Sequence, residues 1–145
     1  MNIESPYFDL PELVCEHVYD KYGSFAWNFL DPRLIVTINT LRDRIGKPIF
    51  VNDWQIHGTF SQRGLRCPDC EIVKSKTDLY MSAHTLGRAV DFDVQGLIAS
   101  EVREWIKQHQ NWWPYPIRLE AGVTWVHLDV YGNSENKKVY EFKKQ

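Results

Sequence analysis

Regularly spaced hydrophobic residues predict helices in the first half of the chain, most clearly over residues 32–45. The apolar side chains of that segment recur at helical spacing and form one stripe: Leu34, Ile35, Ile38, Leu41 and Ile45. Asp31 is typical of an N-cap, Pro32 of a first helical turn and Gly46 of a helix end. The pattern therefore predicts a helix over 32–45.

Two other segments show the same periodicity. Residues 10–22 follow Asp9, which is a suitable N-cap, and stop before Gly23. Residues 98–110 can turn three apolar side chains inward: Val102, Trp105 and Ile106. We predict a helix in each segment.

Short apolar or alternating segments predict strands, mostly in the second half of the chain. They cover residues 48–53, 88–94, 116–122, 124–130 and 137–142. The third and fourth are expected to form an antiparallel hairpin around Ala121 and Gly122, and the last to add an edge strand. Residues 54–83 are predicted to be a long irregular loop, which in a compact domain is usually functional or mobile.

The order of these elements predicts an α+β fold with a small, mostly antiparallel sheet and helices packed on one side. With 145 residues and no repeat or linker, the chain is expected to form a single domain over 1–145. A net charge of −2 argues against nucleic acid as a partner, and no apolar run is long enough for a membrane span. The N-terminus lacks the layout of a secretory signal, so we expect a protein that is cytoplasmic as synthesised. The oligomeric state is not indicated.

Polar residues recur in two of the predicted strands. Because residues two apart in a strand share a face, Asp91 and Asp93 point one way, and so do His127 and Asp129. If the two strands are neighbours, both pairs line the same side, and the loop before residue 88 brings His84 to them. Two histidines and a carboxylate suit a catalytic Zn²⁺ that keeps a fourth position for water. Such an ion makes bound water more acidic and polarises a substrate carbonyl.

The residues alone leave two interpretations open. Alternating carboxylates and a histidine in a strand also occur on ordinary solvated faces, without any metal. In the metal interpretation, Asp93 or Asp129 can orient a ligand through a hydrogen bond. The remaining histidines are interpreted as structural: His17, His57 and His109, of which His57 is notable because it lies in the long loop.

The chain has three cysteines, an odd number that argues against a disulfide framework. Cys67 and Cys70 form a C-x-x-C motif, which is found in redox sites and as half of a zinc site. No second motif follows at zinc-finger spacing, so a turn with two thiols is the simplest interpretation. A second zinc, or a disulfide that braces the loop, is the alternative.

Two motifs resemble those of a known family. Ser82, His84, Gly87, Ala89 and Asp91 match the pattern S-x-H-x-x-G-x-A-x-D, and the segment Trp125–Asp129 matches W-x-H with V-H-x-D. The pattern is similar to that of the zinc D-alanyl-D-alanine carboxypeptidases and murein endopeptidases, which have the hedgehog/DD-peptidase fold. The resemblance covers roughly residues 30–130. The family that it points to includes phage-encoded members.

The resemblance implies roles for particular residues. One zinc ion would be bound by His84, Asp91 and His127. Arg66, with Arg63 as the alternative, would hold the carbonyl or terminal carboxylate of the substrate, for which the fork of a guanidinium is well suited.

One position departs from the pattern. Many relatives have an acidic general base three residues before the last histidine, where this chain has Thr124, which cannot accept a proton from water at neutral pH. Glu120 is the nearest acid. In a regular two-residue hairpin it would lie at the turn, about 13 Å from His127, so the segment 120–125 would have to bulge toward the metal. A solvent-exposed turn residue is the alternative interpretation of Glu120.

The implied activity is hydrolysis of peptidoglycan stem peptides by a zinc metallopeptidase, as a D,D-carboxypeptidase or an endopeptidase. The substrate would be a cell-wall peptide. A phage-encoded member, such as an endolysin, would act from the host cytoplasm or as part of a virion. The alternative is a protein of the same fold that binds zinc but has lost catalysis and serves as a binding or virion structural component.

Overall fold

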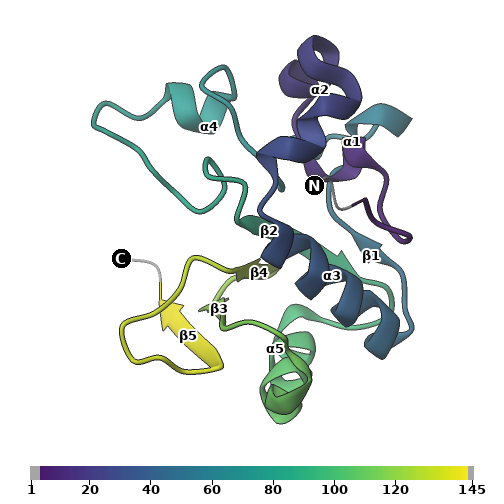
Figure 1. The fold of residues 1–145 in the computed structure, drawn as a ribbon, viewed down its shortest axis with the longest axis vertical. Helices are drawn as coiled ribbons and strands as arrows, with labels where there is room; N and C mark the ends of the chain where they lie inside the picture. The colour runs from purple at the N-terminus through teal and green to yellow at the C-terminus, as the bar shows by residue number, and fades with distance from the viewer. Residues whose placement is uncertain (1–3, 144–145) are drawn as a thin grey trace.

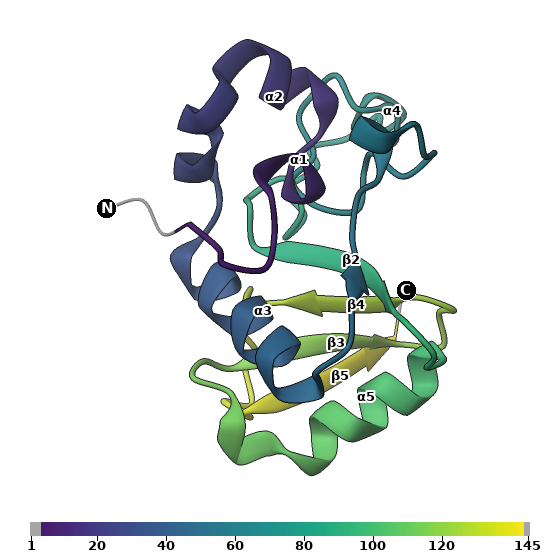
Figure 2. The same ribbon diagram turned by 90° about the vertical axis from the view of Figure 1, so that its right-hand side faces the viewer.

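The computed structural model describes residues 4–143 and has an α+β fold built on one five-stranded sheet (Figures 1 and 2). In spatial order the strands are β1 (Ile49–Phe50), β2 (Ala89–Val94), β4 (Val126–Asp129), β3 (Ile117–Ala121) and β5 (Val139–Lys143). The first three neighbouring pairs are antiparallel, and β5 is parallel to β3. The predicted α+β class is confirmed. The sheet is mixed rather than mostly antiparallel, because the connection after β4 carries the chain past β3 before it forms the edge strand.

The two faces of the sheet differ in chemistry, as period-two alternation requires. One face carries buried apolar side chains: Val90, Phe92, Val126, Leu128, Ile117 and Leu119. The other face carries Asp91, His127, Asp129 and Arg118, which the strand pairing aligns across β2, β4 and β3. The alternation therefore separates a hydrophobic core from a polar surface, and the polar surface holds the site described below.

Helices α3 (Pro32–Ile45) and α5 (Ala99–Gln108) contribute to the same core as the apolar face of the sheet (Figure 2). Helix α3 has the predicted bounds: the Asp31 carboxylate accepts a hydrogen bond from the Arg33 N–H at 2.9 Å, and Gly46 ends the helix in the left-handed conformation. Helix α5 buries Val102 and Ile106 as predicted. No helix within residues 4–143 combines the length and the hydropathy needed to cross a membrane.

The helix predicted over 10–22 is interrupted. It forms α1 (Leu10–Leu13) and α2 (Glu16–Tyr22), and Val14 between them is extended and forms an isolated bridge with Leu65. The Val14 carbonyl accepts hydrogen bonds from the side chains of Asn52 and Trp54 at 3.1 and 3.0 Å. These tertiary hydrogen bonds replace the helical ones at this position, which is why the local periodicity did not predict the break.

The long loop after β1 is irregular, as predicted, and contains two short elements. A single turn of 3-10 helix covers Trp54–Ile56, and α4 covers Glu71–Lys74. Further 3-10 turns follow α2 over Gly23–Phe29 and α5 over Gln110–Trp112. Figure 1 shows that the part of the loop around α4 extends away from the sheet on the same side as α2.

Candidate metal centre

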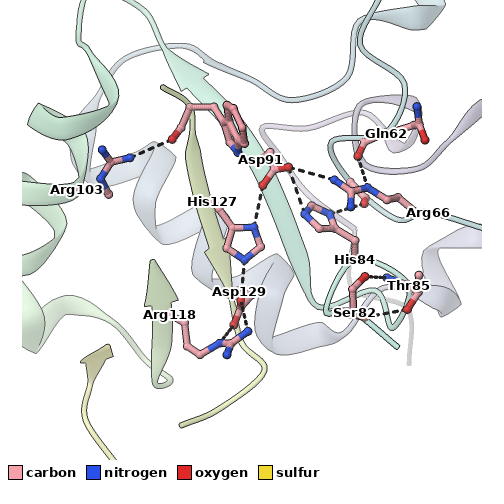
Figure 3. A network of polar contacts seen from close by, with 12 residues as sticks. Gln62, Arg66, Ser82, His84, Thr85, Asp91, Arg103, Arg118, His127 and Asp129 are labelled. Atoms are coloured by element: carbon pink, nitrogen blue, oxygen red, sulfur yellow. Dashed lines mark hydrogen bonds and ion pairs between the residues drawn. The ribbon is translucent and has the colours of Figure 1, made fainter. Parts of the chain in front are cut away.

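Strands β2 and β4 place Asp91 directly opposite His127, and the turn before β2 adds His84 (Figure 3). Asp91 Oδ1 lies 2.8 Å from His127 Nδ1, and Asp91 Oδ2 lies 3.3 Å from His84 Nε2. One ligand atom from each of the three residues lies within 4.8 Å of the others, and all three side chains are buried. The three residues expected to meet therefore form one cluster.

The turn that carries His84 explains the small and polar residues around it. Ser82 Oγ accepts a hydrogen bond from the Thr85 N–H at 3.2 Å, and Thr85 Oγ1 donates to the Ser82 carbonyl at 2.9 Å. Gly87 follows with a φ of 69°, and a Cβ there would lie 1.9 Å from the Phe29 carbonyl oxygen. Only glycine fits this backbone contact, so Gly87 lets the turn that carries His84 pack against the chain at Phe29.

The second nitrogen of each imidazole has its own partner, which orients the ring. His84 Nδ1 donates to the Gly64 carbonyl at 2.9 Å, because a carbonyl can only accept, and this leaves Nε2 facing Asp91. His127 Nε2 lies 2.7 Å from Asp129 Oδ2, which leaves Nδ1 facing Asp91. Metal-binding histidines usually show this arrangement, in which the outer nitrogen donates to a carbonyl or carboxylate.

Arg118 completes a chain of charged groups behind His127. It donates to both carboxylate oxygens of Asp129, at 2.9 and 3.0 Å, and the Asp129 side chain is fully buried. Asp129, rather than Asp93, therefore contacts a predicted ligand, since Asp93 is half exposed and pairs with Arg63 instead. Arg118 was not predicted. The signal that could have indicated Arg118 is its position in the strand, since alternation places it on the same face of the sheet as Asp129 in the neighbouring strand.

Burial and ion pairing act in opposite directions on these groups. Burial alone would raise the pKa of Asp91, but hydrogen bonds from His127 and His84 outweigh it and hold that pKa well below its usual range. Burial would lower the pKa of His127, but hydrogen bonds to Asp129 and Asp91 raise it to about 9. Burial alone would also raise the pKa of Asp129, but hydrogen bonds from His127 and Arg118 outweigh burial. The pKa of Asp129 is therefore lowered. Hydrogen bonding and ion pairing therefore outweigh burial at all three groups.

A cavity of about 430 Å³ lies beside the cluster, and Asp91 is part of its wall. Arg66 and Arg63 also line this cavity. Arg66 Nη2 donates to Asp91 Oδ2 at 3.3 Å and Arg66 Nε to the Gln62 carbonyl at 2.6 Å, so the guanidinium is held next to a predicted metal ligand. Arg63 is more deeply buried and pairs with Asp93 at 3.0 Å.

Glu120 occupies a strand rather than a turn. Strand β3 continues through Ala121, and the connection to β4 spans four residues, 122–125. The paired positions of β3 and β4 end at Leu119 and Leu128, so Glu120 is the next residue on the face that Arg118 shares with His127. Glu120 is half-buried. The β3–β4 connection is longer than the predicted two-residue turn, and Glu120 is not among the residues that line the cavity beside Asp91.

The β3–β4 connection is held by an arginine that the sequence did not indicate. Arg103 of α5 is buried and donates to the carbonyls of Val123 and Trp125, at 3.1 and 3.0 Å. Thr124 lies between these two residues, is exposed, and lines the cavity with Trp125. The connection therefore forms a fixed rim of the cavity.

Comparison with known proteins adds no relative: no family model, no curated protein and no solved structure matches the chain. The site is accordingly interpreted from its own geometry. Two imidazole nitrogens and a carboxylate lie close together, and each imidazole is oriented through its other nitrogen; this donor set fits a divalent cation such as Zn²⁺.

Proposed function

We propose that the protein is a zinc-dependent peptidase that hydrolyses peptidoglycan stem peptides, as a D,D-carboxypeptidase or a murein endopeptidase of the hedgehog/DD-peptidase fold. The observation that carries the proposal is the meeting of His84, Asp91 and His127 from separate segments beside a cavity. These are the residues that match the motifs of that family. The buried, oriented donor set distinguishes them from the solvated polar strand faces that were the alternative interpretation.

The proposed ion is held by His84 Nε2, an Asp91 carboxylate oxygen and His127 Nδ1, the three atoms that face one another. Three protein ligands are typical of catalytic zinc sites, whereas structural sites have four. When bound, zinc supplies Lewis acidity that polarises a carbonyl and makes water more acidic. Asp129 keeps the His127 ring in place and supports its binding as a ligand.

Arg66 is proposed to bind the substrate. Its guanidinium lies in the cavity wall next to Asp91, and contacts to Asp91, Gln62 and Tyr80 engage three of its five N–H groups. A carbonyl or terminal carboxylate of a stem peptide can accept two hydrogen bonds from such a fork. Arg63 contributes positive charge to the same wall while it remains paired with Asp93.

Glu120 is proposed to carry the proton. Thr124 cannot do so, whereas Glu120 lies on the His127 face of the sheet and is half-buried. Its carboxylate takes a proton from the attacking water and returns it to the leaving amine when the peptide bond breaks.

A second cavity beside the first supports the proposal that the substrate is a peptide rather than a single amino acid. It has a volume of about 490 Å³ and shares Phe60 and Asp93 with the wall of the first cavity. Its other wall residues include Phe50, Ile56 and Pro11, which offer apolar contacts. Two adjoining cavities can accommodate several residues of a stem peptide.

The first test is hydrolysis of purified peptidoglycan. We expect new amine termini in the presence of the protein, loss of this release with a chelator, and recovery when Zn²⁺ is added. Metal binding without any release would contradict the proposal and support the alternative, a zinc-containing binding or virion protein.

The second arm of the test addresses Glu120. Glu120→Gln should lower the rate of release by about 10²- to 10⁴-fold while the zinc content stays unchanged, because the residue moves a proton and binds no metal. Glu104→Gln is the matched control, since Glu104 is an exposed residue of α5. If Glu120→Gln retained full activity, the assignment of the base would be wrong even though the peptidase proposal could stand.

A further inference from the structure

A second group of metal-binding side chains lies where the long loop meets the N-terminal helices. Cys67 and Cys70 come from the loop, and Cys15 and His17 come from the start of α2. One ligand atom of each lies within 4.8 Å of all the others. The turn expected at Cys67 and Cys70 is present, but the sequence interpretation left His17 out because its partners are about 50 residues away.

The spacing within this cysteine cluster fits a tetrahedral ion. Zn–S bonds of about 2.3 Å and Zn–N bonds of about 2.05 Å place two sulfurs about 3.8 Å apart, and a sulfur and a nitrogen about 3.6 Å apart. The Cys67 and Cys70 sulfurs are 4.0 Å apart. His17 Nδ1 lies 3.6 Å from Cys67 Sγ and 3.8 Å from Cys70 Sγ. The four side chains surround a space of the size that zinc requires.

The local backbone prepares the two loop cysteines for this role. The Cys70 N–H donates to the Cys67 carbonyl at 3.1 Å, which forms a tight turn and directs both sulfurs to one side. The Asp69 N–H points at Cys67 Sγ at 3.4 Å, a contact that stabilises a thiolate. All three cysteines are free thiols, and the 4.0 Å between the Cys67 and Cys70 sulfurs is twice the length of a disulfide bond. A disulfide brace is therefore not what joins the loop to the helices.

We infer that Cys15, His17, Cys67 and Cys70 bind a second Zn²⁺ ion, in a four-coordinate structural site. Three thiolates and one imidazole fill the tetrahedral shell and leave no position for water or substrate. This distinguishes the cysteine cluster from the His84–Asp91–His127 centre, which supplies three ligands. The inference does not depend on the proposed peptidase activity.

The second ion would act by joining two segments that also hold the first site. Leu65, two residues before Cys67, pairs with Val14, and its N–H donates to the Leu13 carbonyl at 2.8 Å. The other side of the same segment contacts the first centre, because the Gly64 carbonyl accepts from His84 and the Arg63 carbonyl accepts from the Asp91 N–H. Residues 63–66 thus lie between the two sites, and zinc at the cysteine cluster would hold Arg66 in position.

The test begins with the unmodified protein, because Cys15 and Cys70 are buried and their replacement can prevent folding. Protein saturated with Zn²⁺ and freed of excess metal is treated with a mercurial reagent under native conditions. The reagent blocks thiolates but not imidazole or carboxylate, and a chromogenic chelator reports the zinc released. We expect release of about one ion per chain. Thiols that react equally fast with and without Zn²⁺, and release no metal, would overturn the inference.

A variant and a spectroscopic probe make the assignment specific. His17→Gln changes an exposed side chain and should abolish the mercurial-sensitive zinc. His57→Asn is the control and should keep this zinc. His57 is also exposed, and its left-handed backbone conformation is one that asparagine tolerates. Co²⁺ added to the metal-free protein should show thiolate-to-cobalt charge-transfer bands, and His17→Gln should reduce them. Cobalt spectra without such bands would refute the site. A protein that binds this zinc but fails to hydrolyse peptidoglycan would leave the inference intact and remove only the proposed function.

Discussion

Asp129 shows how a single buried residue can orient a proposed metal ligand without being a ligand itself. Its carboxylate is fully buried, contacts His127 Nε2 at 2.7 Å and is paired with both donor nitrogens of Arg118. The negative charge keeps the His127 ring oriented and makes its other nitrogen a better ligand. The charge on Asp129 is itself maintained by Arg118, so these three residues work as a unit.

We predict that Asp129→Asn weakens Zn²⁺ binding at the His84–Asp91–His127 centre by about 10- to 100-fold, because the amide is a weaker hydrogen-bond acceptor for the imidazole. Competition with a chromogenic chelator measures the effect. Asp93→Asn is the matched control, since Asp93 lies two residues after Asp91 on the same face but is half exposed and pairs with Arg63. Equal losses in the two variants would show that the negative charge of this face, and not the contact with His127, determines affinity.

At the level of elements, the break between α1 and α2 and the segment 63–66 determine how the loop meets the rest of the fold. Gly64 lies against the last turn of α1, where a Cβ would be 2.1 Å from the Leu13 carbonyl oxygen. The same glycine presents its own carbonyl to His84. One small residue therefore allows the backbone approach that links the N-terminal helices to the His84–Asp91–His127 cluster.

Gly64→Ala is expected to lower the free energy of unfolding by about 1–3 kcal/mol, because the added methyl group must push two backbone segments apart. Urea denaturation measures the loss. Ser134→Ala, at an exposed position in the connection before β5, should stay within about 0.5 kcal/mol of the wild type. A Gly64→Ala protein as stable as this control would mean that the two segments can separate freely, and that their close contact does not position His84.

At the level of the whole molecule, one hydrophobic core joins the parts that carry the two sites. It includes side chains of α1 and α2, of helices α3 and α5, and of the apolar face of the sheet. His127 lies between Val126 and Leu128 in β4, whose side chains point into this core. The position of the polar residues therefore depends on how well the opposite face is packed.

Leu128→Ala should destabilise the protein by about 2–5 kcal/mol, because the side chain is completely buried and its removal leaves a cavity. Leu79→Ala is the matched control: the Leu79 side chain is 91% exposed and should contribute little. Thermal unfolding of both variants, saturated with Zn²⁺, compares them. A loss below 1 kcal/mol for Leu128→Ala would show that the core refills around β4, contrary to the close packing assumed.

Local signals predicted those elements whose stability is itself local. Helix α3 has the predicted bounds because its cap, its apolar stripe and its terminal glycine all lie within 16 consecutive residues, 31–46. Strands β2 and β4 were expected from alternation, and the same alternation correctly placed Asp91 and His127 on one face. The α1–α2 break was missed because it depends on Asn52, Trp54 and Leu65, which are distant in the sequence.

The sequence alone indicated His84, Asp91 and His127 as candidate ligands and placed Asp91 and His127 on one face of their strands, since this follows from residue type and a period of two. Only the tertiary structure decided which of them meet. The strand order placed Asp91 opposite His127, and the parallel return of β5 made the sheet mixed. The fold of the loop brought Cys67 and Cys70 to Cys15 and His17. Such meetings depend on contacts between residues far apart along the chain, which no local pattern of side chains records.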